Sequence, residues 1–497
     1  MKREAGILLS ISSLPSHYGI GCFSKEAYRF VDWLEAAGQS YWQILPMGPT
    51  GYGDSPYQSF STFAGNPYFI DLEALCKKGL LTKEECDAAE LEGDPGDINY
   101  GDLYNRRIPL LHTAFERSSH KKSAEYLEFL QANEDWLPDY TLFMALKDAN
   151  DGAAWTSWPN ELKIRNPEAI SEAKERLARQ IDFYAFLQYE FLAEWGRLHN
   201  YAAAHGISII GDIPIYVSLD SADVWASPEL FQLDENNVPK QIAGCPPDGF
   251  SAIGQVWGNP LYDWPYHEKT GYEWWIRRLL NCFRLYDSVR IDHFRGFDEY
   301  YAIPFGEDTA INGHWEKGPG MSLFRTVLEK LGPRDIIAED LGYVTDSVRK
   351  LVKDTGFKNM KVLEFAFDSR DTGSAADYLP HNYGTNCVAY TGTHDNETIR
   401  GWFGSITDEE RAAVRTYLCD KCTPDSQLYL PMIALILRST ASLAVIPIQD
   451  WLGLGNEARM NRPSSIGTNW RWRVPGEALS EELADMIRTE TESFGRA

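Results

Sequence analysis

The segment 287–297 places a carboxylate beside a permanent cation. Apolar and charged side chains alternate from Val289 to Asp292, which is the period of a β-strand with one apolar and one charged face. Arg290 lies on the same side of such a strand as Asp292, so it would lower the pKa of that carboxyl and keep it ionised, as a nucleophile requires. The segment therefore predicts a nucleophilic carboxylate, with a surface Arg–Asp pair as the alternative.

Carboxylates also end three other predicted strands, at Asp212, Glu339 and Asp395. If the four strands belong to one barrel, their acids converge on one cleft. Two carboxyl groups on either side of a glycosidic bond are the minimum for glycoside cleavage, one as nucleophile and one as proton donor. Glu339 is followed by Asp340, and strand alternation alone leaves open which of the two points into the cleft.

A metal site is the alternative use for clustered acids. Zinc and hard-cation sites usually include histidines or a denser set of acids. His293 and His394 flank acids, but neighbours on a strand point to opposite faces. Cys419 and Cys422 form a C-x-x-C pair without a second pair or a histidine at ligand spacing. We therefore expect no metal and no other cofactor.

Short apolar segments that read as strands alternate with helical patterns along the chain. They are residues 6–11, 41–46, 207–212, 288–292, 335–339, 361–367, 387–390 and 443–449. Such a series predicts parallel β/α units buried on both faces, and this number of units predicts a (β/α)8 TIM barrel with its chemistry at the strand carboxyl ends. A doubly wound sheet is the alternative. It would need a glycine-rich phosphate turn after the first strand, which residues 12–16 lack.

The predicted barrel carries two insertions. Residues 48–180 are too many for a connection and contain several amphipathic helical patches, so we expect a helical insertion subdomain after strand two. Residues 213–266 predict an irregular insertion after strand three, with a loop at 245–257. The whole chain, 1–497, is then one catalytic domain without a separate C-terminal β-sandwich. The helix after strand six is short or absent between Asp368 and Asn386.

Composition disfavours several classes of partner. The net charge is −25 and the pI is about 4.8, which is unfavourable for binding nucleic acid or anionic lipid. The mean hydropathy is −0.37, and no apolar run approaches about 18 residues, so we expect no membrane span. The first residues resemble a strand and not a signal peptide. The eight scattered cysteines predict free thiols in a reducing compartment, and hence a cytoplasmic protein.

Several motifs taken together are typical of one enzyme family. The sequence reads GPTGYGDSPYQ at 48–58, FAGNPY at 63–68 and NRP at 461–463. Four further motifs, GDIPIYV, VRIDH, AEDLG and TGTHDNE, lie at 211–217, 289–293, 338–342 and 391–397. On these motifs the chain resembles, over essentially its whole length, amylomaltase, the bacterial 4-α-glucanotransferase family (glycoside hydrolase family 77), a relative of the α-amylase clan.

The resemblance implies roles for the acids. Asp292 would be the nucleophile and Glu339 the acid/base, and Asp395 would be a third acid that grips sugar hydroxyls most strongly in the transition state. It also implies a set of substrate-binding residues: Ser55, Tyr57, Asp212, Trp257, Arg290, Asp368, His394 and Asn461. Core aromatics are the alternative for Tyr57 and Trp257, and a turn residue is the alternative for Asn461.

The resemblance further implies the reaction. We expect a retaining transglycosylase that moves α-1,4-glucan segments from a donor glucan to the 4-hydroxyl of an acceptor glucan or glucose. Its partners would be maltooligosaccharides and glucose, with no cofactor, nucleic acid or membrane, and it would be a monomer or a weak homodimer. A hydrolase of the same clan and a non-catalytic glucan-binding barrel are the alternative functions.

The loop 245–257 is a candidate lid. A transferase must keep water from its covalent intermediate until an acceptor arrives, and a closing loop can do this. Gly249 and Gly254 permit hinge motion, and Phe250 would place an apolar ring at the tip. The alternative is that Phe250 docks onto the insertion.

Overall fold

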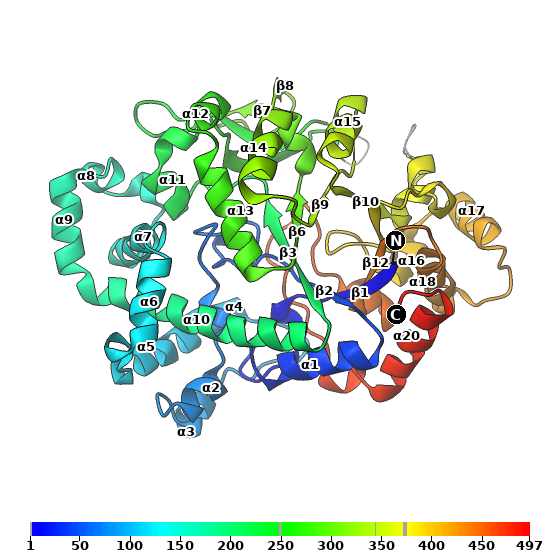
Figure 1. Ribbon diagram of the computed structural model, residues 1–497, viewed down its shortest axis with the longest axis horizontal. Helices are drawn as coiled ribbons and strands as arrows, with labels where there is room; N and C mark the ends of the chain where they lie inside the picture. Colours follow the sequence, from blue (N-terminus) through cyan, green and yellow to red (C-terminus); the bar gives the residue numbers. More distant parts are fainter. Residues whose placement is uncertain (1, 248–250, 343, 371–374) are drawn as a thin grey trace.

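The computed structural model describes residues 2–247, 251–342, 344–370 and 375–497. Within these ranges, eight parallel strands close into a barrel in the order β1-β12-β11-β10-β9-β6-β3-β2 (Figure 1). The strands are β1 (Glu4–Leu8), β2 (Tyr41–Gln43), β3 (Ser208–Pro214), β6 (Ser288–Asp292), β9 (Ile336–Ala338), β10 (Lys358–Val362), β11 (Cys387–Tyr390) and β12 (Leu443–Pro447). The predicted (β/α)8 barrel is confirmed.

The barrel strands are buried on both faces, which explains their nearly continuous apolar sequences. Side chains from different strands form one cluster that fills the interior: Leu8, Ile210, Ile337, Met360, Val362, Val388, Tyr390, Leu443 and Val445. The neighbouring residues on the same strands, such as Ile7 and Ile209, join the larger core under the helices. Alternation along each strand thus divides its residues between the two cores.

Helices cover the outside of the barrel (Figure 1). They are α1 (Lys25–Ala36), α10 (Ala178–Ala204), α13 (Glu273–Leu285), α14 (Met321–Leu331), α15 (Asp346–Thr355), α16 (Ile399–Ser405), α17 (Asp408–Leu418), α18 (Tyr429–Leu437), α19 (Ile448–Trp451) and α20 (Glu481–Ser493). Ser24 caps α1 by accepting a hydrogen bond from Glu26 N at 3.3 Å. The apolar face of α13 buries Trp275, Leu279 and Cys282, whose spacing of three to four residues predicts such a face.

The sixth strand of the barrel differs from its predicted position. The apolar run 361–367 suggested a strand, but β10 spans Lys358–Val362 and the residues after it form the 3-10 helix η9 (Leu363–Phe367). Pairing decides the boundary, because Asn359 is in register with Cys387 and Val362 with Tyr390, where β11 ends. A strand that has lost its neighbour has no partner for its backbone groups, so the chain turns there.

The segment 48–180 contains short helices, as predicted. They are α2 (Leu72–Lys77), α3 (Lys83–Ala88), α4 (Tyr100–Asp102), α5 (Ile108–Arg117), α6 (Ala124–Ala132), α7 (Leu137–Ala149), α8 (Asn160–Lys163) and α9 (Pro167–Arg176). In Figure 1 the cyan helices of this group lie to one side of the barrel, and α10 runs from them to the barrel wall. The segment therefore extends one side of the fold.

The segment 213–266 is more regular than predicted. It contains α11 (Ala222–Ala226) and the strands β4 (Gln241–Cys245) and β5 (Gln255–Pro260). Its last residues begin the helix α12 (Trp264–Lys269). In the described part of the chain, β4 and β5 join β7 (Glu299–Pro304) and β8 (His314–Lys317) in an antiparallel sheet of order β5-β4-β7-β8. Half of this sheet comes from the segment after β6, so the strands of 213–266 depend on partners distant in sequence.

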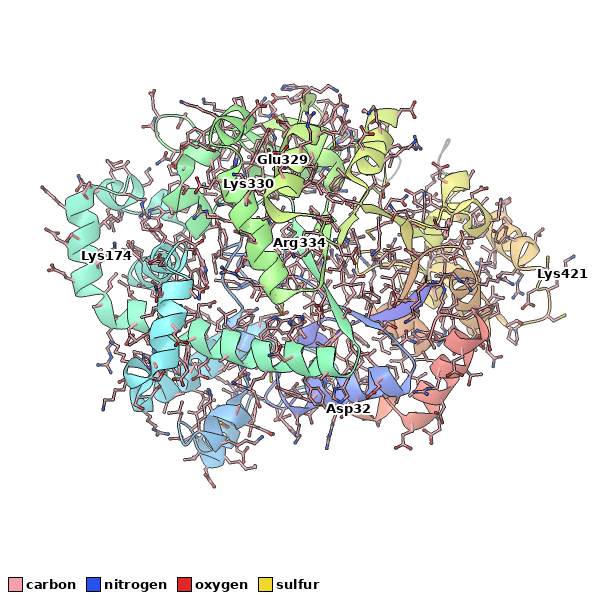
Figure 2. The ribbon with its side chains drawn as sticks, viewed as in Figure 1. Asp32, Lys174, Glu329, Lys330, Arg334 and Lys421 are labelled. Atoms are coloured by element: carbon pink, nitrogen blue, oxygen red, sulfur yellow. The ribbon has the colours of Figure 1, made fainter. Side chains whose placement is uncertain are left out.

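Charged side chains lie at both ends of the molecule in Figure 2. Figure 2 shows Lys174 of α9 and Lys421, just after α17, at opposite ends of the view.

Among the helices that the structure describes, none has the length and apolarity needed to cross a bilayer. Between Asp368 and Asn386 the described residues form the 3-10 turns η10 (Ala375–Tyr378) and η11 (Pro380–Asn382), in agreement with a short or absent sixth helix.

Candidate active site

Four predicted acids lie at the carboxyl ends of barrel strands. Asp212 is within β3, Asp292 is the last residue of β6, Glu339 directly follows β9, and Asp395 lies in the segment after β11. Since all barrel strands are parallel, these acids come to the same end of the barrel, where such folds place their chemistry.

A buried arginine joins two of these acids. Arg290 Nη1 donates to both carboxylate oxygens of Asp212 at 2.8 Å, and Nη2 donates to Asp292 Oδ1 at 2.9 Å. Arg290 is 2% exposed and Asp212 is 0% exposed. The predicted Arg290–Asp292 pair is confirmed, and the alternative of a surface pair is wrong.

Asp292 and Glu339 titrate as a pair. Burial, and then the charge of Asp292, raises the pKa of Glu339 to about 8, against the opposing effect of Arg290. Burial also raises the pKa of Asp292, although Arg290 opposes this rise. The expected lowering by Arg290 is therefore real, but burial outweighs it. The Asp292 side chain is 28% exposed and hydrogen-bonded to a cation, both of which favour its ionised form, so the shared proton lies on Glu339.

The structure separates Glu339 from its neighbour. Glu339 Oε2 accepts from His293 N at 2.6 Å and Oε1 accepts from Leu341 N at 3.0 Å, which fixes the carboxyl beside the end of β6. Asp340 Oδ1 instead accepts from Met360 N of β10 at 3.0 Å. Glu339 is thus the acid that interacts with Asp292, whereas Asp340 supports the barrel wall.

The carboxyl group of Asp395 contacts Asn461 and His394, and His394 in turn contacts Tyr57. Its Oδ1 accepts from Asn461 Nδ2 at 2.6 Å, and its Oδ2 lies 3.3 Å from His394 Nε2. The Tyr57 hydroxyl donates to Asp212 Oδ2 at 2.8 Å and contacts His394 Nε2 at 2.8 Å. Burial alone would raise the pKa of Asp395, but His394 and Asn461 hold it below its usual range. Asp395 is therefore ionised, and Tyr57 links the two halves of the site.

Ser55 and Trp257 lie beside residues of the site. Ser55 Oγ accepts from Tyr57 N at 3.2 Å, so it orients the backbone of the tyrosine. Trp257 of β5 packs edge-to-face on His293 with ring centroids 4.8 Å apart. Trp257 also packs against the main hydrophobic core, so its role as a sugar-binding residue stays a prediction.

The roles predicted for Asp368 and Phe250 stay predictions. Asp368 follows η9 and forms its ion pair with Arg370, whose Nη2 lies 2.8 Å from Asp368 Oδ2. This pairing, together with hydrogen bonds from the same arginine, lowers the pKa of Asp368. Phe250, the predicted tip of the lid, lies outside the described residues.

Two residues of the site were missed from the sequence. His293 has a left-handed backbone (φ 53°), which directs its N–H to Glu339, and burial lowers the pKa of its ring to about 3. Arg459 donates from Nη2 to Asp395 O and from Nε to Asn461 O, both at 2.7 Å. Their positions next to Asp292 and two residues before Asn461 are the signals that could have identified them.

The described ranges contain no cluster of three or more His, Cys, Asp or Glu side chains that could hold a metal ion. The site acids are paired instead with Arg290, Asn461, His394 and backbone N–H groups. Such an arrangement leaves the carboxyl groups to act directly as nucleophile, acid and hydrogen-bond acceptor.

Comparison with known proteins identifies the family. The sequence model of the family described as 4-alpha-glucanotransferase, glycoside hydrolase family 77, matches residues 9–480. This chain belongs to that family. A 4-alpha-glucanotransferase from Clostridium butyricum is 48% identical over 492 residues, which cover 98% of this chain and 100% of that protein. One from Thermus thermophilus is 46% identical over 507 residues, covering 100% and 99%.

Solved structures agree with this membership. Amylomaltase from Streptococcus agalactiae in complex with acarbose has a TM-score of 0.96 at 40% identity, with 100% of both chains covered. Amylomaltase from Corynebacterium glutamicum has a TM-score of 0.78 at 18% identity, covering 98% of this chain and 75% of that one, which supports the fold. As a member of this family the chain transfers glucan segments, and the alternative of a non-catalytic barrel is set aside.

Proposed function

We propose that glucan transfer proceeds by double displacement, with Asp292 as the nucleophile and Glu339 as the acid/base. The observation that carries this assignment is that one carboxyl group of the pair is protonated and the other is ionised. Glu339 holds a proton at neutral pH because its pKa is about 8, while Arg290 hydrogen-bonds to Asp292 and favours its ionised form. A proton donor and an anionic nucleophile are what a retaining mechanism requires.

In the first step, Asp292 attacks the anomeric carbon of the donor glucan. Oδ1 is held by Arg290, so we assign the attack to Oδ2. The bond from the anomeric carbon to the glycosidic oxygen breaks as Glu339 transfers its proton to that oxygen. The products are a glycosyl ester on Asp292, a released glucan with a free 4-hydroxyl, and an ionised Glu339.

In the second step, ionised Glu339 removes the proton from the 4-hydroxyl of an acceptor. The acceptor oxygen attacks the anomeric carbon, the ester bond to Asp292 breaks, and the starting protonation is restored. Asp395, ionised and oriented by Asn461, accepts hydrogen bonds from sugar hydroxyls that strengthen as positive charge develops on the ring. The positions of these acids are fixed by hydrogen bonds among Tyr57, Asp212, His394 and Arg290.

We propose α-1,4-glucans, maltooligosaccharides and glucose as donors and acceptors. The acarbose complex of the Streptococcus agalactiae amylomaltase supports an oligosaccharide ligand. Scattered cysteines such as Cys22, Cys282 and Cys387, which form no disulfide in the described part of the chain, support a reducing, cytoplasmic location. We further propose a monomer or weak homodimer that works without a cofactor.

We also propose that the loop 245–257 is a lid that favours transfer over hydrolysis, and that 48–180 and 213–266 are insertions within a single domain. The described end of the loop is ordered by Ser251, whose Oγ donates to Gly254 O at 2.8 Å. Gly254 has a φ of 69°, which suits a tight turn before β5. Ile253, half exposed beside this turn, supports an apolar contact surface for a bound sugar.

The assignment of the two acids can be tested with an activated donor. α-Maltosyl fluoride has a leaving group that needs no protonation, so it separates nucleophile from acid. We expect Glu339→Gln to release fluoride in a burst while failing to use maltotriose, and Asp292→Asn to release none. Asp340→Asn is the matched control, because Asn can still accept from Met360 N, and it should keep both activities.

Loss of general acid help should lower turnover of maltotriose by about 10²–10⁴-fold. A Glu339→Gln variant that keeps the wild-type rate on maltotriose, or an Asp292→Asn variant that shows the fluoride burst, would contradict the assignment. Sizing of the maltotriose products tests the reaction itself. Redistribution into shorter and longer glucans is expected, whereas a rise in reducing ends without longer products would indicate hydrolysis.

A further inference from the structure

The segment that carries His394 and Asp395 lies between β11 and α16 and has no regular secondary structure. A helical or strand ladder therefore does not hold its backbone, and side chains around it must do so. Two buried acids that the mechanism does not use, Glu364 and Asp450, border this segment.

Asp450, in α19, holds the two ends of the segment. Its Oδ2 accepts from Thr391 Oγ1 at 2.5 Å, and its Oδ1 accepts from Ile399 N at 2.8 Å. Because one carboxylate binds both ends, the residues between them form a closed loop of fixed span. The conformation of the middle of the loop is decided by other contacts.

Glu364, in η9, lies against the middle of the loop and is 4% exposed. A methyl group added at Gly392 would lie 2.8 Å from Glu364 Oε1 and 3.2 Å from Asn396 Cβ, so these side chains meet over the glycine. Glu364 Oε1 has no hydrogen-bond partner among the described residues, and the Asn396 amide interacts with the carboxyl group.

Asn396 connects this contact to the backbone of Asp395. Its Oδ1 accepts from Thr393 N at 3.0 Å and from Thr393 Oγ1 at 2.8 Å. Thr393 Oγ1 in turn accepts from Asp395 N at 3.3 Å. A displacement of Asn396 would therefore be passed through Thr393 to the residue that carries the third acid.

The charges around Glu364 come from several elements. Asp450 of α19 and Glu397 of the loop are anionic neighbours, and Arg459 is the cation that faces them. Burial, followed by Asp450 and Glu397, raises the pKa of Glu364 well above its usual range, against the opposing effects of Arg459 and Asn396. Arg459 lies 3.6 Å from Glu397 Oε1 and supports Asp395 O from the other side.

We propose that Glu364 is a positioning residue for Asp395, acting through Asn396 and Thr393 to fix the turn at 393–396. The inference rests on the proposed role of Asp395. A carboxyl group that is neutral fits between Asp450 and Glu397, whereas an ionised one would repel both and move the turn. Loss of the proton on Glu364 would then lower the transfer rate by moving the turn, separately from the loss of the proton on Glu339.

The experiment compares Glu364 with a matched buried acid. Glu194 of α10 is 2% exposed, has an unpartnered Oε1 among the described residues, and has its pKa raised to about 8 by burial, but it accepts from Asp71 N. We would measure kcat and KM for maltotriose redistribution from about pH 5 to about pH 10 for Glu364→Gln, Glu364→Ala, Glu194→Gln and Glu194→Ala. Thermal unfolding sets an assay temperature at which every variant is folded.

We expect Glu364→Ala to lower kcat by about 10- to 100-fold with little change in KM, as a misplaced group does. Glu364→Gln keeps the volume and the neutral form, so it should restore kcat at neutral pH to within about threefold and leave a basic limb with the slope of one proton. Both Glu194 variants should change the unfolding temperature while keeping the wild-type kcat and pH profile.

The positioning role is overturned if Glu364→Ala keeps the wild-type kcat and pH profile, or if Glu194→Ala loses kcat to the same extent. It is also overturned if Glu364→Gln is as impaired as Glu364→Ala. Asp395→Asn separates this failure from that of the proposed function. An active Asp395→Asn would remove Asp395 from the mechanism, whereas an inactive one beside a fully active Glu364→Ala would remove only the role of Glu364.

Discussion

The two halves of the active site are held by different means. On one side, Asp212 and Arg290 are in direct register on β3 and β6, and their buried charges fix Asp292. On the other side, Tyr57 and His394 come from loops 337 residues apart and meet through a hydrogen bond and stacked rings. The strand half takes its geometry from the ladder, whereas the loop half takes it from a few side-chain contacts. Single substitutions should therefore harm the halves differently.

The largest effect is expected on the free energy of unfolding when Arg290, the cation that pairs with Asp212 and Asp292, is removed. Arg290→Ala leaves Asp212 buried without its counter-ion, which should lower the free energy of unfolding by about 3–5 kcal/mol. Urea unfolding measures this change. As a control, Arg349→Ala removes a surface ion pair with Asp377 and should cost about 0–1 kcal/mol. Equal losses in the two variants would show that the buried array does not hold the site.

The pH dependence of activity should separate the same two halves. The rate should fall about tenfold per pH unit once Glu339 has lost its proton, above its pKa of about 8, and more steeply if Glu364 also titrates. Asp395, whose pKa lies below its usual range, should contribute no limb near neutral pH. A rate that keeps rising through pH 9 would contradict the protonation of Glu339.

Stability should change with pH for the same reason. The pKa of Glu339 is raised from 4.5 to about 8, so its protonated form stabilises the fold fully below 4.5. That contribution is lost as the pH rises through 8. Glu339→Gln should therefore flatten the decline in the free energy of unfolding between these pH values. Denaturant unfolding at several pH values measures this change. If the free energy of unfolding declines equally in the wild type and in Glu339→Gln, the expectation is incorrect.

A smaller effect is expected from the link between the halves. Tyr57→Phe removes the hydroxyl that contacts Asp212 and His394, and should lower kcat/KM by about 10- to 100-fold through misplacement. Its cost in stability should be about 1–3 kcal/mol, because buried partners lose a hydrogen bond. A wild-type kcat/KM would show that the two halves are positioned independently.

The smallest effect is expected at Ser55, which contacts the backbone of Tyr57 and, among the described residues, none of the acids directly. Ser55→Ala removes the acceptor for Tyr57 N and should cost about 0.5–1.5 kcal/mol. If Ser55 only orients the loop, kcat and KM should both change by less than about threefold. A large rise in KM at constant kcat would instead make Ser55 a direct ligand of the glucan, as the resemblance to the family implies.

Much of the fold and of the strand half could be predicted from local pattern. The run from Val289 to Asp292 has the period of a strand, which predicts Arg290 and Asp292 on one side of it, and the two side chains are hydrogen-bonded in the structure. Positions that depended on distant partners were harder to predict. Residues 361–367 looked equally strand-like, yet β11 ends opposite Val362 and the ladder stops there.

The sequence by itself determined the barrel, the strand that carries Asp292 and the family, because apolar period and motif residues are local properties. Only the tertiary structure decided which acids share a proton. Burial and the approach of Asp292 raise the pKa of Glu339, and Asp368, whose role as a ligand stays a prediction, forms an ion pair with Arg370. Desolvation and the distances between charges depend on residues far apart in the chain, so sequence periodicity does not contain them.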